Sequence, residues 1–232
     1  MLHFRSPAVD RDLDPGHGLH TDGRGTSPLS TFSTSGFAPS AVLDTVVGPV
    51  LARDLKAGDQ LLTCDGDPAV VRWVGESMTM YDNANENAPL SARGPVRIKA
   101  GTLDTDPEAG NLVLNAGHKL LVRNPLNELY FGTDEVIAEV GDLTHLDGVD
   151  FVPRSVMRFK HVLLDTHELV RANGIWMESF SPEMWAIRVA FPEKYEEITD
   201  AVPRLKFEGG EANYICPRMA LNNREARLLD YV

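Results

Sequence analysis

Turn-forming residues interrupt this sequence at short intervals, and their spacing constrains the fold more than any other feature. Short apolar runs alternate with Gly48-Pro49, Asp65-Gly66-Asp67-Pro68 and Asn173-Gly174. Glycine, asparagine and aspartate favour tight turns, and short apolar runs between such turns are typical of strands. The predicted strands are residues 41–47, 50–52, 60–64, 69–74, 96–99, 112–114, 119–122, 129–131, 136–140, 161–164, 167–171 and 175–178. This succession predicts an all-β architecture, with a long polar surface loop over 76–95.

Both ends of the chain depart from this pattern. The N-terminal stretch is rich in Gly, Ser, Thr, Asp and Pro without sustained apolar periodicity, which is typical of a flexible leader. Short helices are predicted toward the C-terminus, the first starting at Ser181-Pro182-Glu183 with serine as its cap, the others over 192–201 and 223–229. The expected organisation is a leader, a β domain and a helical extension packed on that domain, over residues 1–35, 36–180 and 181–232.

Charge and hydropathy exclude several classes of function. The formal net charge is −12, which argues against nucleic acid and anionic membrane surfaces as partners because like charges repel. No window approaches 18 uninterrupted apolar residues, so no membrane span is expected. The N-terminus has no cationic region followed by an apolar stretch, so no cleavable signal peptide is expected. Residence in the cytoplasm and export by a non-cleaved signal both fit the sequence.

We expect the cysteines and tryptophans to contribute to packing and not to catalysis or metal binding. Cys64 and Cys216 match neither a metal-ligand spacing nor a disulfide framework. Cys64 follows an apolar pair, so we expect it to be a buried small hydrophobe. The three tryptophans are expected to be core or interface aromatics: Trp73, Trp176 and Trp185.

Three stretches share an order and spacing that together resemble one family. The first is GFAPS at 36–40, followed by LKAGD at 55–59 and PAVVRWVG at 68–75. The second is LVLNAGHKLL at 112–121, and the third is HVLLDTHE at 161–168. Over about 36–230 the chain is similar to the bacterial branch of the Hint (Hedgehog/intein) family, which implies a Hint-like β fold, here with short C-terminal helices.

The resemblance also implies a chemistry. In active members a Cys, Ser or Thr at the first domain position attacks the preceding carbonyl, and a histidine protonates the departing amide nitrogen. The resemblance assigns this acid role to His118, and it assigns the positioning of the amide to Asn115, where the family has Thr or Ser. Gly36 occupies the first position and has no side chain that could attack. We therefore predict that self-cleavage is absent or impaired, and that the domain serves as a structural or binding module with an unknown partner.

An alternative keeps the activity by using Ser35. Its hydroxyl would attack the carbonyl of Thr34 in an N-to-O acyl shift, with His118 as the acid and the chain's own leader as the intramolecular substrate. A shift by one residue moves a backbone atom by about 3.5 Å, which is enough to lose an aligned attack. Ser40 and Thr45 are weaker candidates. Splicing is not expected, because the chain ends in Leu229-Asp230-Tyr231-Val232 and not in the asparagine that splicing requires. At most intramolecular autoprocessing is expected, and no turnover enzyme.

A second alternative is a metal site. His161 and His167 flank a predicted turn, and with His118 they could form a three-histidine zinc site. No local pair of metal ligands supports this site, so separately placed structural histidines are favoured. The sequence predicts neither a metal nor another cofactor.

Overall fold

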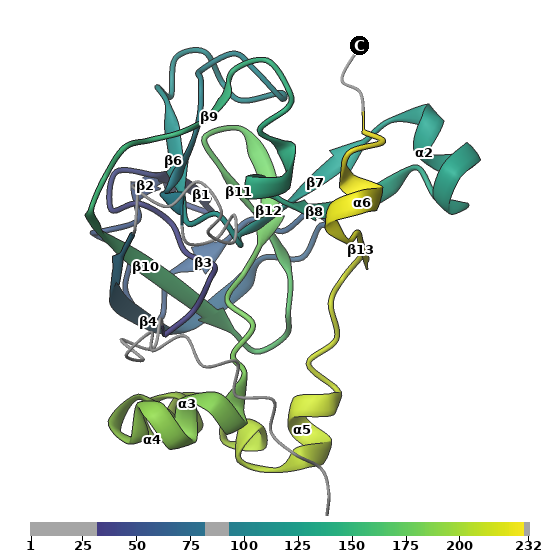
Figure 1. Cartoon of the computed structure of the whole chain (residues 1–232). Helices are drawn as coiled ribbons and strands as arrows, with labels where there is room; N and C mark the ends of the chain where they lie inside the picture. Colours follow the sequence, from purple (N-terminus) through teal and green to yellow (C-terminus); the bar gives the residue numbers. More distant parts are fainter. Residues whose placement is uncertain (1–31, 82–92, 230–232) are drawn as a thin grey trace, which may run out of the picture.

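The computed structural model describes residues 32–81 and 93–229 of the chain (Figure 1). A ten-stranded sheet and a three-stranded sheet form a β body, and short helices lie at one end and along one side of it (Figure 1). The larger sheet runs in the order β10 (Val156–Leu164), β4 (Ala69–Met80), β3 (Gln60–Leu61), β1 (Val42–Thr45), β11 (Leu169–Ala172), β12 (Ile175–Glu178), β7 (Lys119–Arg123), β8 (Glu135–Glu139) and β13 (Met219–Ala220), with β2 (Gly48–Leu51) on β1. The smaller sheet has the order β6 (Leu112–Leu114), β5 (Val96–Ile98) and β9 (Val149–Phe151). The all-β prediction is confirmed.

The core lies between the two sheets because their strands alternate buried and outward-facing residues. In β1, Leu43 and Thr45 point inward, and in β5 and β6 the first and third residues are buried. Alternation with a period of two places one side-chain row of each strand inside. The large buried side chains at the centre include Phe37, Leu43, Leu61, Ile98, Leu112, Leu114, Leu120 and Leu164.

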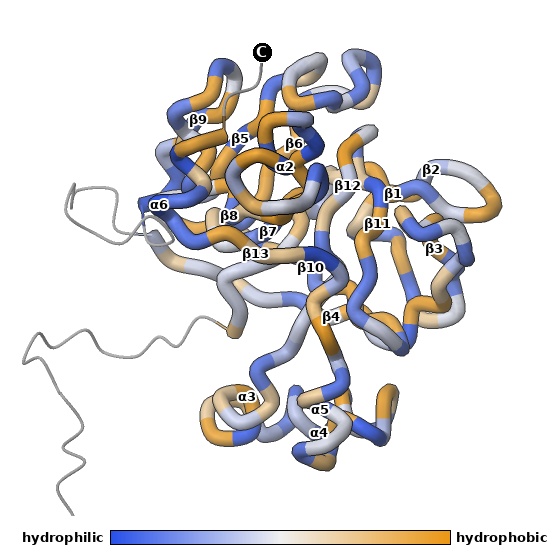
Figure 2. Tube along the Cα trace, turned by 90° about the vertical axis from the view of Figure 1, so that its right-hand side faces the viewer, coloured by the Kyte–Doolittle hydropathy of each residue, from blue (hydrophilic) through white to orange (hydrophobic). Residues whose placement is uncertain are grey.

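A helical unit closes one end of the β body. It consists of α3 (Met184–Ala190), α4 (Pro192–Ala201), the 3₁₀-helix η2 (Pro203–Lys206) and α5 (Glu208–Ala212). Figures 1 and 2 show these helices grouped below the paired strands β4 and β10. Trp73 of β4 and Leu163 of β10 share a buried apolar cluster with Phe180, Met184, Ile187, Ile198, Val202, Leu205 and Tyr214. The helical unit is thus fastened to the sheet by an apolar interface of its own.

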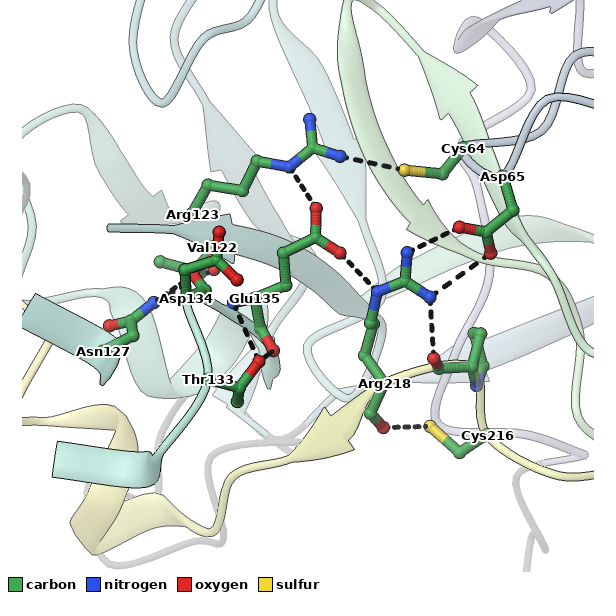
Figure 3. A network of polar contacts seen from close by, with 11 residues as sticks. Cys64, Asp65, Val122, Arg123, Asn127, Thr133, Asp134, Glu135, Cys216 and Arg218 are labelled. Atoms are coloured by element: carbon green, nitrogen blue, oxygen red, sulfur yellow. Dashed lines mark hydrogen bonds and ion pairs between the residues drawn. The ribbon is translucent and has the colours of Figure 1, made fainter. Parts of the chain in front are cut away.

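The C-terminal segment returns to the far edge of the large sheet. There β13 pairs with β8 in parallel, and α6 (Asn223–Ala226) follows after a capping box at Asn222. Arg218 holds this segment, because its guanidinium donates to the carboxylates of Asp65 and Glu135 (Figure 3). Arg123 joins the same network, and its guanidinium donates to Glu135 and to the Cys64 sulfur, the latter at 3.1 Å.

Several sequence predictions need correction. Residues 129–131 are not a strand but belong to the helix α2 (Pro125–Phe131), because Asn124 caps its start and Gly132 ends it in the left-handed conformation. The helix predicted from Ser181 begins three residues later, at Met184. The predicted loop over 76–95 starts too early, because β4 continues to Met80, and its part over 82–92 lies outside the described residues.

Two side chains also differ from expectation. Cys64 is only half-buried and accepts from Arg123, so it is not a buried hydrophobe, although partial burial raises the pKa of its thiol. Trp185 is 77% exposed and is not a core residue, whereas Trp73 is buried. Of the predicted leader, 1–31 lies outside the described residues. None of the helices over 32–81 and 93–229, which include η1 (Val140–Leu143), combines the length and apolar character that a membrane span needs.

Candidate functional site

Gly36 and His118 are joined by a hydrogen bond, although 82 positions separate them in the sequence. The main-chain N–H of Gly36 donates to Nδ1 of His118 at 3.0 Å. The other ring nitrogen, Nε2, lies 2.9 Å from the carbonyl oxygen of Glu178. Because Nδ1 accepts, the ring hydrogen is on Nε2 and is donated to that carbonyl. The imidazole therefore faces the nitrogen of the Ser35–Gly36 peptide bond.

The surroundings keep this imidazole neutral. His118 is 1% exposed, and burial lowers the pKa of its ring, although the nearby Glu178 carboxylate acts in the opposite direction. A neutral ring can accept the Gly36 N–H, whereas a proton on Nδ1 would face that hydrogen directly. In this conformation the ring acts as an acceptor toward the amide.

Asn115 binds the segment of residues 33–36 through both its side chain and its backbone. Its Nδ2 donates to the carbonyl oxygen of Ser33 at 3.1 Å, and its main-chain N–H donates to the carbonyl oxygen of Gly36 at 3.1 Å. Its Oδ1 accepts from the hydroxyl of Tyr81 at 3.2 Å and from the N–H of Ala116 at 2.9 Å. These bonds use both ends of the amide, so the orientation of Asn115 is determined by its partners.

Gly117 contacts Thr34 at very short range. Its N–H donates to the carbonyl oxygen of Thr34 at 3.0 Å. A Cβ on Gly117 would lie 2.6 Å from the Cβ of Thr34 and 2.8 Å from its carbonyl oxygen. Only glycine allows the two backbones to approach this closely.

Ser35 lies in the site, but its hydroxyl faces a different partner. Its Oγ is 3.0 Å from the Oγ of Ser33, and its N–H donates to that same oxygen at 3.0 Å. His118 bonds to the next amide, that of Gly36. The Thr34–Ser35 bond therefore has a donor at its carbonyl, from Gly117, but not the imidazole at its nitrogen.

The backbone at Gly36 leaves no room for a side chain. Its φ angle is +144°, a conformation that residues with a side chain rarely adopt. A Cβ there would lie 2.7 Å from the Cβ of Phe159 and 3.1 Å from Cε1 of His161. Position 36 is thus shaped around glycine.

His161 lies beside Gly36 and is also neutral. Its Nε2 is 2.7 Å from the hydroxyl of Ser77, and its Nδ1 is buried without a hydrogen-bond partner in the described part of the chain. Burial lowers the pKa of His161 to about 3.

His167 belongs to a neighbouring buried cluster around Glu178. Its Nε2 lies 3.4 Å from a carboxylate oxygen of Glu178, and its ring stacks on Tyr214 at 5.6 Å. Glu178 also accepts from the N–H of Lys119 at 3.2 Å. Burial raises the pKa of Glu178, but the hydrogen bond from His167 and the charge of Lys119 outweigh burial and keep it low.

The three histidines do not form a metal site. Both ring nitrogens of His118 are engaged. The ring of His161 contacts Ser77, whereas that of His167 lies beside Glu178. Within 32–81 and 93–229, no three His, Cys, Asp or Glu side chains are grouped so that they could hold a metal ion. The zinc alternative for these residues is therefore wrong.

A pocket of about 270 Å³ opens beside the bound segment. Its lining includes Ser33 and Ser35, Lys119 and Glu178, and residues of α3 such as Ile187. Sequence reasoning missed the contributions of Phe32, Gly117 and Phe159. The phenylalanine at 32 in an otherwise polar leader, and the glycine immediately before His118, were the available signals.

Comparisons with known proteins point to one family. Among solved structures, the chain is similar to a bacterial intein-like domain from Clostridium thermocellum, with 13% identity, a TM-score of 0.41 and coverage of 64% of this chain and 100% of that chain. It is also similar to a DnaB intein from Synechocystis, with 12% identity, a TM-score of 0.36 and coverage of 63% and 99%. No curated protein matches the sequence. The family model of the Hint domain matches residues 35–184, more than half of the chain, and the chain therefore belongs to the Hint domain family.

Proposed function

We propose that this chain is a non-cleaving Hint domain, a structural or binding module that holds its own N-terminal segment in the place of a cleavage substrate. The observation that supports this proposal is the geometry at Gly36. Its N–H is bonded to His118, as a departing amide nitrogen would be, while a side chain at this position would clash with Phe159 and His161.

Acyl transfer needs a nucleophile aligned with a carbonyl. In the family chemistry, the side chain of the first residue attacks the carbonyl before it and the amide nitrogen leaves. Gly36 offers no such atom. An acid at the leaving nitrogen contributes only after an attack has begun, so His118 cannot start the reaction alone.

One observation favours a second candidate, an acyl shift through Ser35. The carbonyl of Thr34 accepts the Gly117 N–H at 3.0 Å, and such a donor would stabilise an oxyanion there. Ser35 Oγ would bond to the Thr34 carbonyl carbon while the C–N bond breaks, and the hydroxyl proton would pass to the Ser35 nitrogen. This nitrogen donates to Ser33 and not to His118, which makes this candidate the weaker one.

The intact mass of the full-length protein tests both candidates. We expect an unchanged mass after long incubation with hydroxylamine or with a thiol. Loss of residues 1–34 that Ser35→Ala abolishes would establish the second candidate and overturn the first. Loss of residues 1–35 would mean cleavage at Gly36 itself, and it would also overturn the non-cleaving proposal. His118→Ala serves as the matched variant for the role of the imidazole.

A further inference from the structure

Phe32 inserts into a box of aromatic rings. The phenyl ring stacks on Phe180 at a centroid distance of 5.5 Å, and it meets the edges of His161 at 5.1 Å and Phe191 at 5.4 Å. Trp73 completes the box at 6.1 Å. Offset and edge-to-face contacts at these distances are favourable beyond the apolar area that they bury.

The residues of this aromatic box come from both the large sheet and the helical unit. Trp73 lies on β4 and His161 on β10, whereas Phe191 joins α3 to α4. Gly75 makes room for the indole, because a Cβ there would lie 1.8 Å from the Trp73 ring. The indole N–H donates to Glu197 of α4 at 2.9 Å. The tryptophan is thus held from the helical side as well, so the box is preformed by the fold.

The rest of the segment is bound mainly through its backbone. Asn115 binds the carbonyl of residue 33, Gly117 binds the carbonyl of residue 34, and His118 binds the N–H of residue 36. Main-chain contacts of this kind are available to any peptide in the same conformation. Ser33 and Ser35 are small and line the pocket of about 270 Å³, which leaves space for larger side chains. Phe32 is therefore the residue whose side chain the site selects.

We propose that this groove is a peptide-recognition site for a segment that carries an aromatic residue four positions before glycine, with Phe32 as the specificity-determining residue. This inference deepens the proposed function and rests on it, because the segment must stay uncleaved to occupy the groove. In this chain the occupant is residues 32–35, tethered to the domain through Gly36.

The tether makes a specific prediction about free peptides. A segment linked to its own site has an effective concentration in the millimolar range, so a weakly binding peptide cannot displace it. Removing the phenyl ring weakens the tethered occupant and leaves the box open. The tethered segment keeps its backbone contacts. A free peptide that brings its own phenylalanine gains the ring contacts that the tethered alanine segment lacks, and it can therefore displace that segment.

The test uses full-length protein and a fluorescent, C-terminally amidated peptide with the sequence of residues 30–35. Fluorescence anisotropy should show saturable binding to Phe32→Ala and little binding to the wild type. The matched control is Phe207→Ala, which removes a phenylalanine that is 67% exposed on the helical unit, and it should behave like the wild type. A peptide with alanine in place of Phe32 should bind Phe32→Ala at least about tenfold more weakly than the phenylalanine peptide.

Two further variants test the same recognition. Gly117→Ala in the Phe32→Ala background should abolish peptide binding, because the added Cβ would reach the peptide carbonyl at position 34. Phe32→Leu is the milder replacement, for use if the alanine variant unfolds by circular dichroism. Absence of binding to a folded variant, or equal binding of both peptides, would overturn the inference. The intact mass of each sample separately reports cleavage, so failure of the proposed function is distinguishable from failure of this recognition.

Discussion

The N–H of Gly36 donates to Nδ1 of His118 at 3.0 Å, while the Cβ position of Gly36 is blocked by Phe159 and His161. The site thus retains the histidine at the amide nitrogen and has filled the place of the nucleophile. The two features meet at one residue. Placing a nucleophilic side chain at residue 36 would therefore require more than exchanging that residue alone, and this leads to the first prediction.

Gly36→Cys should not restore cleavage and should destabilise the fold. Strain from the positive φ angle and overpacking against Phe159 together cost about 2–4 kcal/mol. Urea unfolding and intact mass measure the two effects. Gly48→Ser is the matched control, because φ is +119° there but no heavy atom lies within 4 Å of the added Cβ. Equal destabilisation by both variants would refute the packing argument.

Gly117→Ala should loosen the N-terminal segment. The new Cβ would lie 2.6 Å from that of Thr34, which costs about 1–3 kcal/mol if the segment stays in place. Amide hydrogen exchange at Gly36, whose N–H is bonded to His118, should become faster. Gly209→Ala in α5 is the control, because nothing lies within 4 Å of its added Cβ. Unchanged protection of Gly36 would contradict this prediction.

Stability should fall as the pH drops below about 6.5, because His161 is buried in its neutral form. Its pKa is about 3 in the folded chain and 6.5 for a histidine in water, so the unfolded state binds more protons between these limits. Stability therefore rises with pH through this window, and His161 alone costs about 2 kcal/mol at pH 5. Chemical denaturation across pH measures the slope.

The variant His161→Gln should reduce this slope, since glutamine does not titrate, while the buried His118 maintains the remainder. His145→Gln is its control, because that histidine is exposed and its ring nitrogens lie 3.1 and 3.0 Å from the carbonyl oxygens of Asp142 and Leu229. If the slope is unchanged in the His161 variant and smaller in the His145 variant, the assignment to His161 is wrong.

Arg218→Ala should release the C-terminal segment from the sheet edge. The guanidinium contacts both Asp65 and Glu135, and their loss should cost about 1–2 kcal/mol. Hydrogen exchange at Leu221, whose N–H donates to Ile137 at 2.8 Å, should accelerate. Arg53→Ala removes only an exposed pair with Asp54 at 3.6 Å and should change stability by less than about 0.5 kcal/mol. Equal effects of both variants would exclude a specific role for Arg218.

Local patterns predicted the elements best where a turn or a proline marks their bounds. The strand at 175–178 and the helix at 192–201 are confirmed with their bounds. The strand at 129–131 is wrong because its apolar residues were considered without the Asn124 cap and Gly132, which form a helix. A short apolar run fits both structures, and the residues beside it decide between them.

The candidate site could be predicted only in part from the sequence. The family motifs named Asn115 and His118, and the structure brings both to the segment that ends at Gly36. The role of Phe32 has no local signal beyond one aromatic residue in a polar stretch. Its partners come from β4, β10 and the helical unit, and their proximity follows from the packing of these elements.

The sequence by itself determined the β architecture, because turn residues divide it into short apolar runs, and it determined that residue 36 offers no side-chain nucleophile, because glycine has no side chain. Only the tertiary structure decided which amide His118 faces and what fills the space beside Gly36. Those contacts join residues 82 or more positions apart, and their geometry depends on how strands and helices pack against each other.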